Sequence, residues 1–422
     1  MTARIFKSLR KHRNYRLFFM GQIVSLAGTW MQNIALAWFV VELTHSPLAI
    51  GGLAFCRFLP FLLFGLYAGV IADRFDNRKL VMATQAAQMV VSIALTALVY
   101  SGWENIPATF ALAFVGGAAL VLDAPGRQSL TFQMVGRDEL PNAVALNTGL
   151  FNGARIIGPA IAGVIIAAGG VGICFAINTV TFLAVLAALA LMREGDLFTV
   201  ERDAEPKRAL AAIREGVSFA WHHPELRLVL LILGIASTVG FNFHVILPVL
   251  TSETLSAGPE VFGALSACFG AGALLGALIQ AARGRASWKA LLLGATVFSS
   301  GLVVLAPVQT VALAGLILFV VGVGFTVWVS NTSALLQLRA PDRLRGRVMS
   351  LFMFAFAGLA PIGGLFAGWL MHVGGTPLAL SLGGAASLAV VAYAWTRQPS
   401  LHAARRTVEL FGAQQDEATR AA

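Results

Sequence analysis

The chain has 422 residues, of which 58% are apolar and 12% charged, and it carries a formal net charge of +10. Soluble domains contain about 25% charged residues, so this composition excludes an ordinary globular protein and predicts a polytopic membrane protein in a lipid bilayer. The basic residues are spread over many connections and form no single stripe with aromatic partners, which argues against nucleic acid as a partner.

About twelve apolar runs follow one another, each near the 20 residues that a helix needs to cross a bilayer. Backbone groups in hydrocarbon must be satisfied within the segment, and the alternating pattern of a barrel is missing, so the runs are predicted to be helices. The expected spans are 16–43, 47–72, 79–100, 106–131, 142–168, 172–192, 226–250, 258–282, 287–306, 309–336, 346–372 and 376–396.

Connections that contain Lys and Arg alternate with connections that contain neither. The basic ones are the N-terminal arm, the segment after span two, the middle linker and the segments after spans eight and ten. Those without Lys or Arg include 44–48, 101–107, 251–260 and 373–377. The positive-inside rule then predicts a multi-pass protein of the cell (inner) membrane with both termini cytoplasmic. The N-terminal arm is interpreted as a retained anchor and not as a cleaved signal peptide.

The one long charged linker, 193–225, divides six predicted spans from six. Its residues from Pro206 onward carry apolar side chains at helical spacing, which fits a helix on the membrane surface or an ordinary soluble linker helix. The expected organisation is therefore an N-terminal half (1–192), the linker, a C-terminal half (226–400) and a cytoplasmic tail expected to be disordered (401–422).

An internal repeat supports this division. A shift of about 204 residues aligns Ser129, Gln133, Asp138, Leu140 and Val144 with Ser333, Gln337, Asp342, Leu344 and Val348. A shift of about 207 aligns Gly65 and Gly69 with Gly272 and Gly276. Two copies of a six-helix unit in the same orientation are implied. The predicted fold class is an all-α membrane protein with twelve transmembrane helices in two six-helix pseudo-symmetric halves.

The short turn between spans two and three carries the sharpest local pattern: Gly69, Asp73, Arg74 and Arg78. It resembles the signature of the major facilitator superfamily, although Asp76 stands where that family usually has Gly and Asn77 where a basic residue is usual. The Asp-Arg-Phe-Asp form is similar to the branch of enterobactin exporters and macrolide-efflux proteins, and the chain's length and layout fit that branch.

The resemblance implies that this turn is a cytoplasmic gate. An Asp at the end of span two can sit against the N-terminus of another helix and pair with Arg when the cytoplasmic side is closed. The resemblance places that partner at the start of span eleven, near Arg343 to Arg347. The alternative is that Asp73, Arg74 and Arg78 are solvated loop charges that follow the positive-inside rule.

Span five carries small residues around a proline: Gly153, Gly158, Pro159 and Gly163. They resemble the Gly-Pro motif of proton-coupled exporters in the same superfamily, in which small residues let helices approach and proline bends the span. This resemblance favours export over import. A generic small-residue packing face is the alternative.

Four of the ionisable residues inside predicted spans matter most here: Arg57, Asp123, Arg127 and Arg155. Each costs roughly 2.5 to 3.5 kcal/mol on insertion scales and is expected to face protein or water. Asp123 is the candidate proton carrier, with Arg127 at i,i+4 or Arg57 as its charge partner. A permanent ion pair between spans is the alternative. His244 in span seven is interpreted as a helix-bridging hydrogen bonder or as a titrating group.

Other polar and aromatic residues within spans are candidates for lining a central cavity: Gln32, Asn33, Trp38, Asn147, Asn152, Asn242 and Asn331. One sequence does not orient the helices, so which faces line the cavity stays open.

Enzyme motifs are missing. No lysine follows a glycine as in a phosphate-binding loop, and neither HExxH nor GxSxG occurs. The three cysteines form no pair or metal cluster, so no metal or cofactor is expected. The hypothesis is a proton-coupled exporter of hydrophobic or amphipathic small molecules, such as drugs or siderophores, by alternating access. The alternatives are an uncoupled carrier or lysolipid/lipid transporter of the same fold, and a non-transporting membrane receptor.

Overall fold

The computed structural model describes residues 6–103, 105–198 and 209–421, and within them the side chains except those at 66, 69–73, 209–213, 342–343 and 398–421. The described residues form helices and no strand. The first part comprises α2 Lys7–Lys11, α3 Arg13–Thr44, α4 Pro47–Arg74, α5 Asn77–Tyr100, α6 Ile106–Gly169, α7 Val171–Ala190 and η1 Glu194–Asp196. The second comprises α8 Ala209–His222, α9 Pro224–Ile235, η2 Ala236–Gly240, α10 Phe243–Val249, η3 Leu250–Thr254, α11 Pro259–Arg283, α12 Trp288–Leu305, α13 Val311–Arg339, α14 Asp342–Met353, η4 Phe354–Gly358 and α15 Ala360–Ala421.

Side chains that cap the first turn fix where several helices begin. The Asp76 carboxylate accepts a hydrogen bond from the Lys79 backbone N–H at 2.9 Å and so caps α5. Asn105 caps α6 and Ser287 caps α12 in the same way. Such caps satisfy backbone donors that the helix itself leaves free. Asp76 stands where the major facilitator signature usually has Gly, and in this chain its carboxylate stabilises the start of α5.

Helices α6 and α15 are too long to cross a bilayer once. They contain 64 and 62 residues, whereas about 20 are enough for one crossing. Each is interrupted by a glycine with positive φ, Gly136 at 69° and Gly375 at 71°, a conformation that glycine adopts without steric cost. The described residues contain 10 candidate spans, and counting the two interrupted ones twice gives the predicted twelve. The predicted all-helical membrane fold is confirmed.

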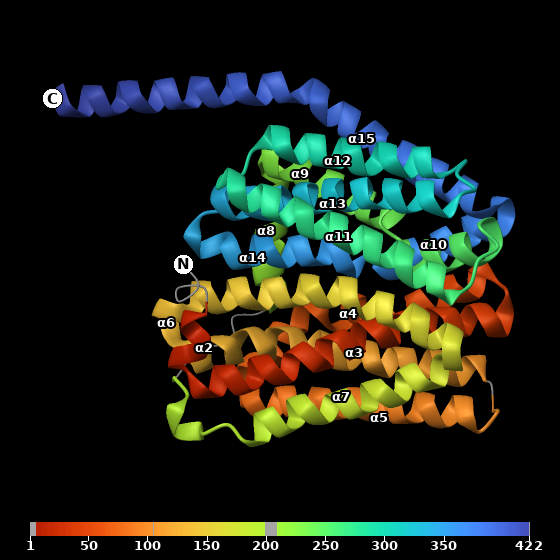
Figure 1. Ribbon diagram of the computed structural model, residues 1–422. Helices are drawn as coiled ribbons and strands as arrows, with labels where there is room; N and C mark the ends of the chain where they lie inside the picture. The colour runs from red at the N-terminus through yellow and green to blue at the C-terminus, as the bar shows by residue number, and fades with distance from the viewer. Residues whose placement is uncertain (1–5, 104, 199–208, 422) are drawn as a thin grey trace.

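Two groups of helices lie side by side in Figure 1. Helices α2 to α7 form one group, here called the N-terminal half, and α9 to α15 form the other, the C-terminal half (Figure 1). The linker helix α8 joins the second group through an ion pair between Glu215 and Arg347 of α14. Pro206, where the sequence predicted that this helix begins, lies outside the described residues.

At the chain end, α15 continues as a helix to Ala421 and runs beyond the bundle (Figure 1). The many Ala, Glu, Gln and Arg residues of this segment are strong helix formers. That segment 401–422 is disordered stays a prediction.

The halves pack closely at one end of the bundle, through glycines. A Cβ atom at Gly51 of α4 would lie 2.8 Å from the carbonyl oxygen of Gly364, and one at Gly368 would lie 2.8 Å from that of Pro47. On the other side, a Cβ at Gly163 of α6 would lie 2.7 Å from the carbonyl oxygen of Pro259 in α11. Only glycine permits such approach of two backbones. We call this the closed end.

The same helices separate toward the other end. A Cβ atom at Gly65 of α4, or at Gly149 or Gly153 of α6, would meet no other atom within 4 Å. Leu275, which would oppose Gly149 if the antiparallel packing of α6 on α11 continued, is 39% exposed. We call this the open end. It is the end at which the basic turn after α4 lies.

Candidate functional site

Arg155 lies between the two halves, about midway along the second part of α6. Its guanidinium carbon is 4.7 Å from the centroid of the Phe269 ring, 5.5 Å from that of Phe325 and 5.9 Å from that of Trp30. Phe269 and Phe325 belong to α11 and α13, whereas Trp30 belongs to α3. Aromatic faces attract a cation within about 6 Å, so rings from both halves hold this one charge.

Arg57 of α4 contacts α3 close to the point where Arg155 does. Its Nη2 donates a hydrogen bond to Oδ1 of Asn33 at 2.6 Å. Asn33 follows Trp30 by three residues, which places both side chains on one face of α3. Phe58, which follows Arg57 in α4, contacts the His244 ring of α10 at a centroid distance of 4.9 Å. The two arginines therefore belong to one region, where α3, α4 and α6 meet the C-terminal half.

The seventh span is broken in this region, where the sequence predicted one helix over 226–250. It consists of α9, the π-helical η2, a break at Phe241 and Asn242, and α10. Asn242 donates from Nδ2 to the carbonyl oxygen of Thr238 at 2.7 Å, but its own Oδ1 is buried without a partner. Breaks and π-turns inside a span commonly mark transporter binding sites.

The break turns an aromatic side chain toward the site. The Phe241 ring stacks on Phe325 at a centroid distance of 4.3 Å and on Phe356 of η4 at 5.7 Å. Phe325 also contacts Phe269 at 5.6 Å. An extended aromatic surface of the C-terminal half thus faces Arg155. We call these residues, with Arg57 and Arg155, the central site.

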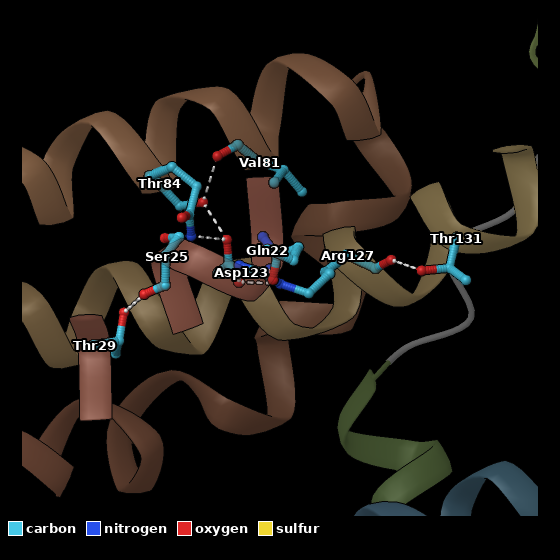
Figure 2. A network of polar contacts seen from close by, with 9 residues as sticks. Gln22, Ser25, Thr29, Val81, Thr84, Asp123, Arg127 and Thr131 are labelled. Atoms are coloured by element: carbon cyan, nitrogen blue, oxygen red, sulfur yellow. Dashed lines mark hydrogen bonds and ion pairs between the residues drawn. The ribbon is translucent and has the colours of Figure 1, made fainter. Parts of the chain in front are cut away.

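Asp123 and Arg127 lie in a separate network inside the N-terminal half (Figure 2). Oδ2 of Asp123 accepts hydrogen bonds from Nε and Nη2 of Arg127 at 2.8 and 2.5 Å. Its Oδ1 accepts from Thr84 at 2.8 Å and from Gln85 at 2.9 Å. Arg127 also contacts Gln22 of α3. Asp123 is only 2% exposed and both of its oxygens are engaged, which is the geometry of an ion pair that joins α3, α5 and α6.

Comparison with known proteins identifies the architecture. A family model described as "Transmembrane secretion effector" matches residues 6–414, which is nearly the whole chain. The protein belongs to this family of major facilitator superfamily transporters.

Several transporters are similar to it along most of their length. The Staphyloferrin A transporter of Staphylococcus aureus is 26% identical over 380 residues, which cover 89% of this chain and 94% of that protein. The multidrug efflux pump Tap of Mycolicibacterium fortuitum is also 26% identical over 380 residues, covering 87% and 92%. Macrolide efflux protein A of Streptococcus pyogenes is 21% identical over 364 residues, covering 84% and 89%.

Solved structures share the fold of this transporter. A peptide transporter POT in complex with sulfate superposes with a TM-score of 0.73 at 13% identity, covering 92% of this chain and 95% of the other. A bacterial homolog of the human lysosomal transporter Spinster gives a TM-score of 0.64 at 12% identity, covering 90% and 94%.

The turn after α4 is described only in part in this transporter. The Asp73 side chain and the environment of Gly69 lie outside the described residues, as does the Arg343 side chain that was expected to face Asp73. Arg74 is exposed. Arg78 donates to the carbonyl oxygens of Leu189 and Ala190 at 2.7 and 3.0 Å and to Glu194 at 2.7 Å. It therefore holds the C-terminus of α7, where unsatisfied carbonyls attract a cation.

The residues of the span-five motif in this transporter face different neighbours. A Cβ at Gly158 would lie 2.8 Å from the carbonyl oxygen of Ala27, so this glycine serves packing on α3. Pro159 and Gly163 contact Gly263 of α11 and form part of the closed end. Gly153 faces open space. Small residues of this motif thus pack on both halves.

The remaining cavity candidates of the transporter form contacts that a sequence does not reveal. Gln32 accepts a hydrogen bond from Asn178 of α7 at 2.6 Å, and Asn152 donates to Thr148 of its own helix at 2.9 Å. Two others face their own half: Asn147 accepts from Tyr15 at 3.0 Å, and the fully buried Asn331 donates to Gln280 at 2.8 Å.

Trp38 lies nearer the closed end. Its Nε1 donates to Glu42 at 2.8 Å, and its ring stacks on Phe262 of α11 at a centroid distance of 5.9 Å. Among the cavity candidates, Asn33 and Asn242 are the ones that the structure brings to the central site. Phe241, Phe269 and Phe325 were not singled out from the sequence. The Gly-Phe-Asn step at 240–242 inside an apolar span is a weak signal for Phe241, and nothing in the sequence marks the other two.

Proposed function

We propose that this transporter is a proton-coupled exporter of hydrophobic or amphipathic small molecules, working by alternating access from the cell membrane. The halves 1–192 and 226–400 would move against each other, joined by the linker 193–225, with both termini cytoplasmic. Its relatives include a staphyloferrin A transporter, a multidrug efflux pump and a macrolide efflux protein, and these favour export of small molecules.

The observation that carries this proposal is the asymmetric packing of the halves around the central site. Glycine contacts hold the halves together at Gly51 and Gly163, while Gly65 and Gly149 face open space. The open end carries the basic turn with Arg74 and Arg78, which the positive-inside rule assigns to the cytoplasm. The conformation described is then inward-facing, the state in which an exporter takes up substrate.

Coupling to protons requires a titrating group whose charge state favours one conformation. Asp123 stays our candidate: its protonation would release Arg127 and loosen the contact of α6 with α3. The saturated hydrogen bonds of Asp123 favour the second candidate function, an uncoupled carrier in which Asp123 and Arg127 form a permanent ion pair.

Transport into everted membrane vesicles tests the proposal. We expect vesicles that contain the protein to accumulate fluorescent hydrophobic compounds when energised, and an uncoupler to abolish this uptake. Vesicles without the protein are the control. Uptake that equilibrates but never rises above the external concentration would favour the uncoupled carrier. No uptake of any compound in the panel would contradict both and favour the receptor alternative.

A further inference from the structure

The central site contains two positive charges and, in the described part of the chain, no carboxylate that pairs with either. Arg57 donates one hydrogen bond, to a neutral amide. Arg155 makes ring contacts alone. Neither guanidinium lies within 4.0 Å of a described carboxylate, whereas Arg127, one span away, is paired with Asp123 at 2.5 Å.

The carboxylates of the spans whose side chains the structure describes lie away from both arginines. Asp123 is bound by Arg127. Glu42 lies beside Trp38, and Glu253 and Glu260 lie at the outer ends of their spans. The central site therefore has a net positive charge at the depth where an uncompensated charge is most costly. Charges inside spans commonly mark substrate or ion pathways.

The aromatic rings around Arg155 compensate its charge only in part. A ring face attracts a cation but leaves the five N–H donors of a guanidinium without acceptors in its plane. Both arginine side chains are partly exposed, although they lie between helices in the middle of the bundle. A planar fork of donors matches the two oxygens of a carboxylate.

We propose that the substrate is an amphipathic carboxylate. Its carboxylate binds Arg155 and Arg57, and its apolar part lies against the rings of Phe241, Phe269 and Phe325. The class of substrate follows from charge and shape. An anion compensates the charges of the two arginines, and the aromatic surface favours a flat or apolar body. This inference rests on the proposed function, since it names the class of molecule that the exporter would carry.

Because Arg155 belongs to the N-terminal half and its rings mostly to the C-terminal half, the bound carboxylate would meet groups from both. Phe58 and His244 extend this contact across α4 and α10. A substrate that binds both halves at once can stabilise a state in which they approach at the open end.

Matched pairs of probes test the inference. We would measure binding of pyrenebutyrate and pyrenebutanol, naphthylacetate and naphthylethanol, and dodecanoate and dodecanol to the purified full chain in lipid nanodiscs near neutral pH. In each pair the apolar body is retained and the charge is removed. We expect at least one acid to bind about tenfold more tightly than its alcohol, the ratio that one charge-assisted hydrogen bond provides.

Variants assign that preference to the central site. In Arg155→Gln the preference for the acid should disappear, in Arg57→Gln it should weaken, and in Arg155→Lys, which retains the charge, it should persist in part. Arg227→Gln is the matched control because Arg227 also lies over a ring, that of Trp221 at 5.7 Å, but outside the central site. If Arg155→Gln does not fold, Arg57→Gln and Arg155→Lys still test the assignment.

The inference is wrong if no acid binds more tightly than its alcohol, or if the preference survives in both Arg155→Gln and Arg57→Gln. Its failure is distinguishable from that of the proposed function. Uncoupler-sensitive uptake of neutral compounds without any preference for acids would overturn the inference alone. Selective binding of acids without transport into vesicles would support the central site and contradict the proposed function.

Discussion

Arg155 and Phe269 belong to different halves of the transporter, yet the guanidinium carbon of Arg155 lies 4.7 Å from the centroid of the Phe269 ring. The contact falls where the close packing of α6 on α11 ends, beside Gly270, at which a Cβ atom would lie 3.0 Å from the carbonyl oxygen of Arg155. A movement that opens the closed end must change this contact. The central site is thus placed at the hinge of the movement that we propose.

Glycine at the closed end should be sensitive to substitution. A Cβ at Gly263 would lie 2.9 Å from Cα of Gly163, so Gly263→Ala forces two backbones apart at a cost of about 1–3 kcal/mol. Gly153→Ala faces open space and gains about 1 kcal/mol of helix propensity. We expect the melting temperature in detergent to fall for the first variant and to stay or rise for the second. Equal melting temperatures would contradict the packing described.

The pair of Asp123 and Arg127 should behave as one unit. Asp123→Asn leaves the partly buried Arg127 without its counter-charge, and such loss costs about 3–5 kcal/mol. We therefore expect a lower melting temperature for Asp123→Asn, partly restored in the double variant with Arg127→Gln.

The same variant decides between the two roles of Asp123. Loss of uphill uptake into vesicles while downhill uptake persists would support Asp123 as the carrier of the coupling proton, even if the melting temperature falls. Loss of stability without a specific loss of coupling would identify a permanent ion pair.

Much of the architecture follows from the sequence, because hydropathy over about 20 residues reports the bilayer directly. The twelve crossings and the turns at Gly136 and Gly375 were predictable for that reason. The break at Phe241 and Asn242 was not, since the span remains apolar throughout and the break depends on packing against its neighbours.

The central site was predictable only in part. Arg57 and Arg155 stand out because charges inside spans are rare. The rings around Arg155 lie more than 100 residues away along the chain, and which faces meet depends on helix rotation, which one sequence does not specify. The contact between Asp123 and Arg127 was easier to predict, because an i,i+4 spacing brings two side chains together within one helix.

Arg78 should stabilise the N-terminal half in a way that Arg74 does not. Its guanidinium donates to Leu189, Ala190 and Glu194 together, a geometry that lysine lacks. Arg78→Lys should lower the stability by about 1.5–3 kcal/mol, the range for hydrogen bonds that involve a charged group. Arg74→Lys, at an exposed position in the same turn, should leave the melting temperature unchanged. The reverse order would contradict the contacts of α5 with α7.

The N-terminal helix should detach in acid. Nζ of Lys7 lies 2.7 Å from Oε1 of Glu139, in the connection after Gly136, and Nζ of Lys11 lies at 3.6 Å. The hydrogen bond from Lys7 lowers the pKa of Glu139 below its ordinary value of 4.5. A lowered carboxyl pKa stabilises the folded state above the ordinary value, and this stabilisation is lost as the pH falls through the lowered pKa.

Limited proteolysis of the N-terminus checks this point. With a protease that is active in acid, we expect cleavage near α2 to increase as the pH is lowered from 5 toward 3. In Glu139→Gln this increase should be missing, because that variant should be cleaved at every pH. A pH profile that is the same in both proteins would show that Glu139 does not hold α2.

The central claim is that the two halves alternate between packing together at the closed end and packing together at the open end. Distances between spin labels test this claim most directly. One label pair would replace Gly149 and Leu275 at the open end, and the other would replace Leu48 and Val373, which are 43% and 62% exposed, at the closed end. On addition of substrate or a change of pH, we predict that the first distance shortens while the second lengthens. Two distances that stay fixed, or that change in the same direction, would contradict alternating access in this transporter.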